Sequence, residues 1–134
     1  MFDILDISAS GLVAQRTRVT TIAQNIANAT TTHDAQGRRV PYQRRIVSFA
    51  AGRRSDPSQP GVHVSGISKD TAAPRRVFEP GHQDADAQGY VSYPDIKMEI
   101  EFVNAMEASR AYEANITMMD TAKAMMNSTL RLLA

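Results

Sequence analysis

The sequence predicts an α+β protein. Long N- and C-terminal helices form a coiled-coil-like pair, and a small, irregular, β-rich region lies between them. Apolar residues recur at helical spacing at both ends of the chain, and all 6 prolines and 6 of the 7 glycines fall between about residues 30 and 95. We therefore divide the chain into an axial helix at 1–31, a β/loop region at 32–95 and a second axial helix at 96–134. The two helices form one discontinuous domain.

The N-terminal helix is expected from Phe2 to about Ala29. Its apolar residues recur every seven positions, and no proline interrupts the pattern. Such a repeat is typical of an amphipathic helix with a coiled-coil-like face. The β-branched and polar residues at 30–34 then end the helix and open a loop. The repeated positions are Leu5, Leu12, Val19 and Ile26.

The C-terminal helix is expected from about Ile96 to Leu133, with Asp95 as its N-cap. Apolar residues predominate when the sequence is read in alternating steps of three and four from Phe102. A second row adds further apolar positions, so the helix carries a wide apolar stripe. That second row consists of Ala111, Met118, Met125 and Leu132.

Short strands are expected in the middle region, because β-branched and aromatic residues there lie between glycines and prolines. The candidate strands are Tyr42 to Phe49, a loosely alternating run from Val62 to Ile67, Arg75 to Phe78, and Tyr90 to Tyr93. Residues 52–61 are polar and rich in arginine and proline, so we expect an exposed loop or a disordered tip.

The strongest hydrophobic pattern lies at the chain ends, which are the segments that normally fray. A lone pair of helices buries only one stripe per helix and is marginally stable. We therefore expect the ends to order when they pack against other chains. The predicted subunit interface consists of Leu5, Leu12, Val19, Ile22, Asn25, Ile26, Asn28, Phe102, Met106, Tyr112, Asn115, Ile116, Met119, Met126, Leu130 and Leu133.

Five asparagines lie in or beside the helical stripes. They are surface residues, with Asn28 as a C-cap, or they set the register between packed helices, as a buried Asn does in coiled coils. The sequence leaves both interpretations open. These residues are Asn25, Asn28, Asn104, Asn115 and Asn127.

The charge balance argues against nucleic acid as a main partner. Lys and Arg total 15 against 14 Asp and Glu, whereas a nucleic-acid-binding face shows a basic excess. No segment approaches the roughly 18 apolar residues that span a bilayer, so we expect no direct membrane insertion. The N-terminal residues lack the basic region of a secretory signal peptide. An arginine cluster at 38–54 is interpreted as a solvated face or as a contact patch for an acidic partner.

The sequence predicts no catalytic, metal or cofactor site, and therefore no enzyme. It contains no cysteine, and its three histidines, His33, His63 and His82, have no metal-ligand spacing. Glu99 and Glu101 are two positions apart on a helix and point to different faces, which does not suit a general acid–base pair. No phosphate-binding or nucleophile motif occurs.

Residues 8–32 resemble the N-terminal signature of the flagellar rod and hook axial family. The shared elements are Ser-Gly-Leu at 10–12, Ala-Gln-Arg at 14–16 and Asn-Ile-Ala-Asn at 25–28. Residues 79–94 and 109–126 are similar to the middle motif and the C-terminal helix of the short subunits of the proximal rod. The resemblance covers nearly the whole chain.

This resemblance implies a structural subunit of the proximal rod of the basal body, in the periplasm. Such a subunit assembles through its terminal helices into an axial drive shaft that transmits torque. The implied partners are other copies of itself, proximal and distal rod proteins, a rod–ring adaptor at the base, and the type III apparatus that exports the chain without a cleaved signal peptide. The alternative from periodicity alone is a soluble coiled-coil adaptor or export chaperone, which would be a stable helical dimer with little β structure.

Overall fold

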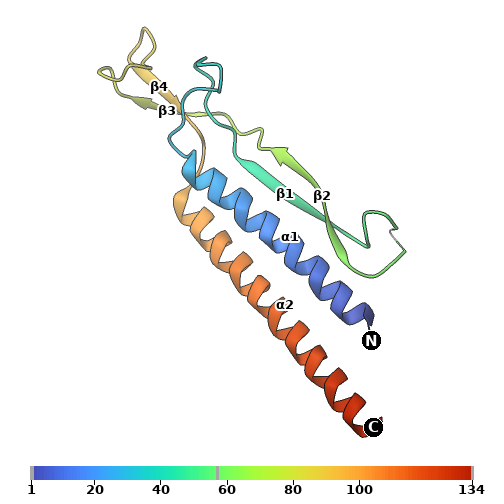
Figure 1. Ribbon diagram of the computed structural model, residues 1–134. Helices are drawn as coiled ribbons and strands as arrows, with labels where there is room; N and C mark the ends of the chain where they lie inside the picture. Colours follow the sequence, from blue (N-terminus) through green and yellow to red (C-terminus); the bar gives the residue numbers. More distant parts are fainter. Residues whose placement is uncertain (1, 57, 134) are drawn as a thin grey trace.

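The computed structural model describes residues 2–56 and 58–133. Within them the chain forms α1 (Phe2–Ala27), β1 (Arg45–Ala51), β2 (Val62–Lys69), β3 (Arg75–Phe78), β4 (Tyr90–Tyr93) and α2 (Met98–Leu133). Two long helices thus flank a short β region in the sequence, which confirms the α+β prediction (Figure 1).

The two helices pack side by side and run antiparallel (Figure 1). Their register is shown by the ion pair between Arg18 and Glu107 and by the close approach of Gly11 to Asn115. Of the helices and strands, α2 packs against α1 alone, whereas α1 also contacts β1 and β2. The first helix, α1, is therefore covered by α2 and by the first two strands, whereas α2 is covered by α1 alone.

The start of α2 differs from the prediction. The helix begins at Met98, and the backbone carbonyl of Lys97 accepts hydrogen bonds from the N–H groups of Ile100 and Glu101, so Lys97 is the cap residue in place of Asp95. Pro94 is buried and holds this connection non-helical, which carries the chain from β4 into the helix.

The strands form two separate antiparallel hairpins, β1–β2 and β3–β4. A bulge between Ser48 and Phe49 bends the first hairpin, which lies along α1 on the side away from α2 (Figure 1). Its first strand begins at Arg45, three residues later than predicted. The preceding Tyr42 is not in the ladder, because its N–H donates to Thr31 O at 3.0 Å and its hydroxyl donates to Asn25.

The core is small and consists mostly of small side chains. Its buried apolar residues are Ala14, Ile22, Val91, Ala108 and Ala122. Large apolar side chains lie instead on the surface, above all on α2. Those exposed on α2 are Ile100, Phe102, Val103, Met106, Ile116, Met118, Met125, Leu130 and Leu132.

Candidate assembly interface

The contact between the helices, which we call the helix seam, is built from small and polar side chains. On α1 it buries Ser8, Gly11 and Ala14, and on α2 it buries Ala108 and Ala122. Small residues let two helix backbones approach closely. The seam is therefore narrow, and the larger apolar residues are displaced to its flanks.

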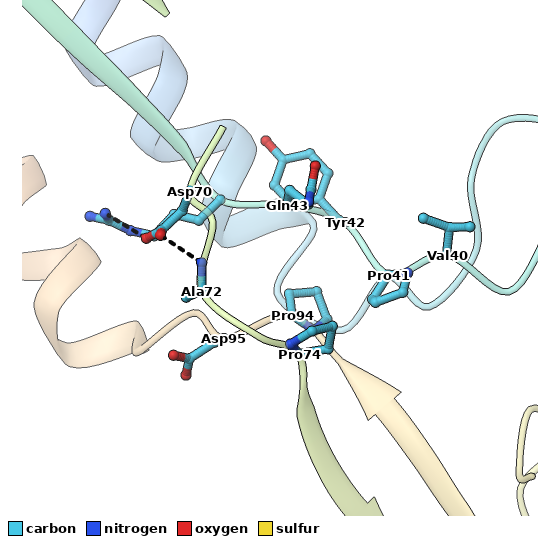
Figure 2. A pocket seen from close by; sticks show the side chains of 10 residues that line it. Val40, Pro41, Tyr42, Gln43, Asp70, Ala72, Pro74, Pro94 and Asp95 are labelled. Atoms are coloured by element: carbon cyan, nitrogen blue, oxygen red, sulfur yellow. Dashed lines mark hydrogen bonds and ion pairs between the residues drawn. The ribbon is translucent and has the colours of Figure 1, made fainter. Parts of the chain in front are cut away.

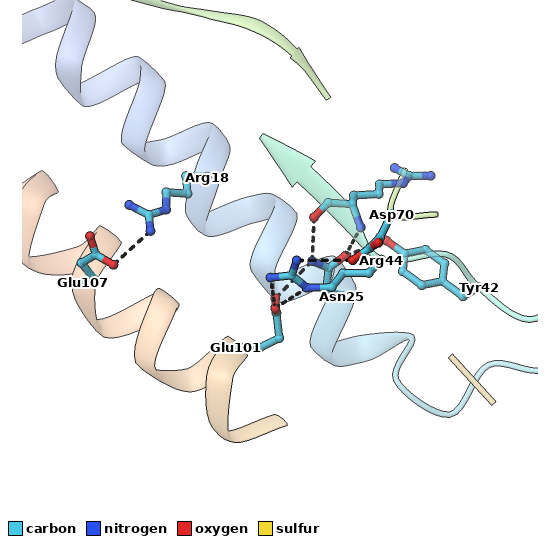
Figure 3. A network of polar contacts seen from close by, with 8 residues as sticks. Arg18, Asn25, Tyr42, Arg44, Asp70, Glu101 and Glu107 are labelled. Carbon is cyan, nitrogen blue, oxygen red and sulfur yellow. Dashed lines mark hydrogen bonds and ion pairs between the residues drawn. The ribbon is translucent and has the colours of Figure 1, made fainter. Parts of the chain in front are cut away.

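One end of the seam carries a buried polar network that joins both helices to the loop before β1 (Figure 3). Glu101 is only 1% exposed, and its carboxylate accepts hydrogen bonds from Arg44 Nε at 2.8 Å and from Asn25 Nδ2 at 3.1 Å. Arg44 also lies 2.6 Å from Glu101 through Nη2. These charge-assisted hydrogen bonds offset the free-energy cost of removing the charged pair from water.

Asn25 is the centre of this network. Its side-chain oxygen accepts hydrogen bonds from the Arg45 N–H at 2.9 Å and from the Tyr42 hydroxyl at 3.2 Å. Its amide nitrogen donates to Arg45 O at 2.9 Å as well as to Glu101. Burial raises the pKa of the Tyr42 hydroxyl; Arg45 opposes this rise and the Glu101 carboxylate adds to it. Asn25 thus sets where β1 begins relative to both helices.

The other end of α1 holds the turn of the first hairpin. Arg53 forms an ion pair with Asp6, and the Val62 N–H donates to Ser10 Oγ at 3.1 Å. Gly61 has φ +143° and lies against Ser10. The predicted loop at 52–61 thus contacts α1 near its two ends, and the described residues 54, 55 and 58–60 are exposed, as expected.

Several arginines of the cluster make contacts within the chain. Arg44 binds Glu101, Arg53 binds Asp6 and Arg38 binds Asp34. Arg39 donates to the backbone oxygens of Gln83 and Ala85, so it ties the two halves of the middle region together. Arg38, Arg39, Arg45 and Arg54 are nevertheless exposed, so the cluster combines contacts within the chain with a largely solvated face.

A groove between the two helices is lined by members of both predicted stripes. It has a volume of about 270 Å³ and is lined from α1 by Arg16, Val19 and Thr20, and from α2 by Ser109, Tyr112 and Glu113. Val19 belongs to the heptad row of Leu5, Leu12 and Ile26, and Ser109 to that of Phe102, Ile116 and Leu130. The two rows therefore meet at this groove, and we call the surface that they form, together with Met119, the groove face.

The predicted interface residues are not all equally accessible. Ile22 and Asn25 are buried within the chain, at 6% and 1% exposure. The remaining members on α1, and Tyr112, Asn115, Met119 and Met126 on α2, are half-buried. The exposed members are Phe102, Met106, Ile116 and Leu130. The side chain of Leu133 lies outside the described residues.

The asparagines divide between the two interpretations. Asn25 and Asn115 lie in the seam and contact the opposite helix. Asn25 donates a hydrogen bond to Glu101 of α2, and Asn115 lies against Gly11 of α1. Asn28 follows the last residue of α1, where its side chain donates to Gln24 O at 2.8 Å and accepts from the Thr31 hydroxyl. The sequence signal for the seam residues was their position beside the heptad stripe.

A second polar cluster fastens the loop after α1 to the β3–β4 hairpin. Asp84 accepts from the Thr32 hydroxyl at 2.7 Å and lies 3.1 Å from His33 Nε2. His82 Nδ1 accepts from the Asp84 N–H at 3.1 Å. These two histidines are half-buried and take part in this cluster of polar contacts. Among the described residues, no group of three His, Cys, Asp or Glu side chains is arranged to hold a metal ion.

A small cavity lies where the connection before β1, the β2–β3 connection and the segment before α2 meet (Figure 2). Its volume is about 100 Å³, and its walls include Pro41, Pro74 and Pro94. Typical sites for small molecules are larger, roughly 300–1,000 Å³.

Neither described helix combines the length and apolar character that a membrane crossing requires.

Comparison with known proteins finds flagellar basal-body rod proteins that match nearly the whole chain. The family model "Flagella basal body rod protein" matches residues 5–32, and the model "Flagellar basal body rod FlgEFG protein C-terminal" matches residues 87–132. The flagellar basal-body rod protein FlgC of Salmonella typhimurium strain LT2 is 39% identical over 132 residues, which cover 98% of this chain and 97% of the relative. FlgC of Bacillus subtilis strain 168 is 36% identical and FlgC of Borreliella burgdorferi is 34% identical, each with 97% of the relative covered, and with 98% and 99% of this chain covered respectively.

The narrow helix pair, the exposed apolar α2 and these matches define a structural subunit of the flagellar basal-body rod. The chain belongs to the FlgC family of flagellar basal-body rod proteins. It therefore assembles with other components of the rod.

Proposed function

We propose that this chain is a non-enzymatic subunit of the proximal rod and that it assembles through its terminal helices. The observation that carries the proposal is that α2, a helix of 36 residues, is covered by α1 on one side and exposes large apolar side chains on both flanks of the seam. An exposed apolar surface of this extent marks a protein–protein contact.

The energy of such a contact comes from removing the apolar side chains from water. Complete burial of one large apolar side chain contributes about 1.5–3 kcal/mol. Association of two proteins costs an estimated 4–15 kcal/mol in lost translational and rotational freedom. Burying four or five side chains such as Phe102, Met106 and Ile116 is therefore enough to offset much of that cost. Helices that pack on both flanks of α2 would form the wall of a tube.

The proposal extends to location and partners. The assembled shaft lies in the periplasm and transmits torque along the rod. Its neighbours are other copies of this chain, other proximal and distal rod proteins, and a rod–ring adaptor at the base. Export by the flagellar type III apparatus is supported by the small core, because few large side chains must leave a buried site when the chain unfolds.

The main test uses Ile116→Asp, which places a charge on the groove face at a residue that is 39% exposed. We expect the purified variant to retain its circular dichroism spectrum, and cells that carry it to lack rods and motility. Ala87→Asp is the matched control, because it adds the same charge at an exposed loop residue away from the helices. Leu12→Asp and Met119→Asp extend the test to half-buried positions of the same face.

Two results would contradict the proposal. Normal basal bodies from all three helix variants would remove the groove face from the assembly interface. Loss of motility with Ala87→Asp to the same degree would show that the assay responds to any added charge.

A further inference from the structure

The methionines of this chain are concentrated on one helix. Residues 2–97 contain none, whereas α2 contains six of the chain's 7 methionines. Of these six, Met106, Met118 and Met125 are 56%, 57% and 63% exposed, and the other three are half-buried. The helix therefore presents thioether sulfurs to water at three positions. The half-buried methionines are Met98, Met119 and Met126.

Met118 and Met125 stand together on one face of α2, and we call these two residues the thioether row. They are seven positions apart, which is about two helical turns. The approach of Gly11 to Asn115 places the first residue of α1 opposite about residue 124 of α2. Met118 thus lies at the level of the first turns of α1, whereas Met125 lies past the described part of that helix (Figure 1).

An exposed thioether is open to oxygen transfer from a peroxide. The sulfur–oxygen bond forms as the oxygen–oxygen bond of hydrogen peroxide breaks, the sulfur loses two electrons, and the peroxide is reduced to water. The product, methionine sulfoxide, is polar, and its oxygen accepts hydrogen bonds. The thiols of a sulfoxide reductase reverse the reaction, because they form a disulfide as the sulfoxide oxygen leaves as water.

The sulfoxide has different consequences in the free chain and in a subunit contact. In the free chain both sulfurs of the row face water, which supplies hydrogen-bond donors, so the fold is retained. In a contact that covers the row, the new oxygen needs a donor from protein. The neighbouring hydroxyls of Thr121 and Thr129 are already donated to the backbone oxygens of Thr117 and Met125, at 2.8 and 2.9 Å. A buried acceptor without a donor weakens association by about tenfold or more.

We propose that Met118 and Met125 are a modification site through which peroxide controls assembly. Their sulfoxides keep the chain out of the rod, and burial in the rod protects their sulfurs from oxidation. This inference rests on the proposed function, because it requires that other subunits cover α2. It adds that the flank marked by the thioether row is covered, and that only the reduced chain is competent for assembly.

Two chains in one cell provide the test. The wild-type chain and the double variant Met118→Leu/Met125→Leu are expressed together at equal levels, and peptide masses distinguish them in isolated basal bodies. Leu has a volume similar to that of Met and cannot form a sulfoxide. Both chains should enter rods equally in untreated cells. At a peroxide dose that oxidises most of the unassembled chain, incorporation of the wild type should fall to about a tenth of the variant's.

The design contains its own controls. Because both chains share one cell, effects of peroxide on other proteins cancel. Met106→Leu is the matched control, since Met106 is similarly exposed and lies outside the row, and its competition with the wild type should not respond to peroxide. Met118→Gln/Met125→Gln places permanent polar groups in the row. It should lose incorporation even without peroxide, while the purified variant keeps its circular dichroism spectrum.

The protection of the row is measured on isolated material. Unassembled chain and isolated basal bodies receive the same peroxide treatment, and the peptides 111–123 and 124–131 are analysed by mass spectrometry for added oxygen. Fragment ions separate Met118 from Met119 and Met125 from Met126. We expect oxidation of Met118 and Met125 in the free chain and loss of this oxidation in the rods.

The outcomes separate this inference from the proposed function. Equal competition in peroxide-treated cells, normal incorporation of the Gln variant, or equal oxidation of the row in rods and in the free chain would each overturn the inference and leave the rod function standing. A Leu variant that fails to enter rods in untreated cells would show that the row depends on side-chain shape, which would also overturn it. Failure of the proposed function would appear as absence of the wild-type chain from the rods of untreated cells.

Discussion

Gly11 of α1 lies directly against the side chain of Asn115 of α2. A Cβ atom added at Gly11 would stand 2.9 Å from Asn115 Nδ2 and 3.0 Å from its Oδ1, closer than normal contacts allow. This contact brings the two helix backbones together in the middle of the seam and leaves the larger apolar residues to its sides.

Gly11→Val should destabilise the helix pair by about 1–3 kcal/mol, because overpacking a tight contact forces its neighbours to move. Urea unfolding followed by far-UV circular dichroism measures the change. Gly11→Val combined with Asn115→Ala should recover part of the loss, since the shorter side chain makes room. Gly66→Ala is the control, as no atom lies within 4 Å of a Cβ there. An unchanged midpoint for Gly11→Val would mean that the seam is looser than described.

Arg44→Met should destabilise the chain far more than Arg18→Met. Each arginine is 25% exposed and pairs with a glutamate on α2, but the Glu101 side chain is 1% exposed and the Glu107 side chain is 66% exposed. Removing the partner of a buried charge costs about 3–5 kcal/mol. Loss of an exposed pair costs about 0–1 kcal/mol. Equal effects in denaturant unfolding would refute the role assigned to the buried network.

The turn between β3 and β4 should open at low pH. The N–H groups of Tyr90 and Gln88 donate to the Asp86 carboxylate, and together with Arg76 they hold its pKa below the ordinary 3.8. A lowered pKa means that the folded turn binds the proton more weakly than the unfolded chain. Its stabilisation is therefore complete above the ordinary value and is lost as the pH falls through the lower, folded pKa.

The Tyr90 amide resonance, followed by NMR from pH 7 to pH 2, reports this opening locally. We expect no change down to about pH 4 and a shift below it. Asp86→Asn retains an acceptor oxygen but cannot titrate, so its resonance should stay constant over the same range. A wild-type transition centred above the ordinary pKa would show that the sign is wrong.

Hydrogen exchange should differ along α2 in the dilute monomer. Amides near Ala108 and Asn115 lie opposite α1, whereas those after about residue 124 have no helix beside them, so the latter should exchange much faster. Mass spectrometry of peptides from 105–118 and 125–133 measures the difference. In assembled rods the second peptide should become protected. Equal protection of both peptides in the monomer would contradict the expectation that the helix ends become ordered on assembly.

The sequence by itself determined the secondary structure well. The distribution of proline and glycine placed the β region between the helices, and the segments predicted at 75–78 and 90–93 match β3 and β4. Periodicity located both helices to within a few residues. These features depend on local sterics and hydrogen bonding, which the residues of each segment carry with them.

Only the tertiary structure decided which face of each helix is used for what. The heptad row of Leu12 and Val19 predicted that a surface is buried, but a hydrophobic pattern does not name the partner that buries it. Inside the chain, close approach of two backbones favours Gly11 and Ala108, which have small side chains and weak sequence signals. Likewise, the pairing of Arg44 with Glu101 joins residues 57 positions apart. Such contacts exist only once the helices are in register, so no local pattern could indicate them.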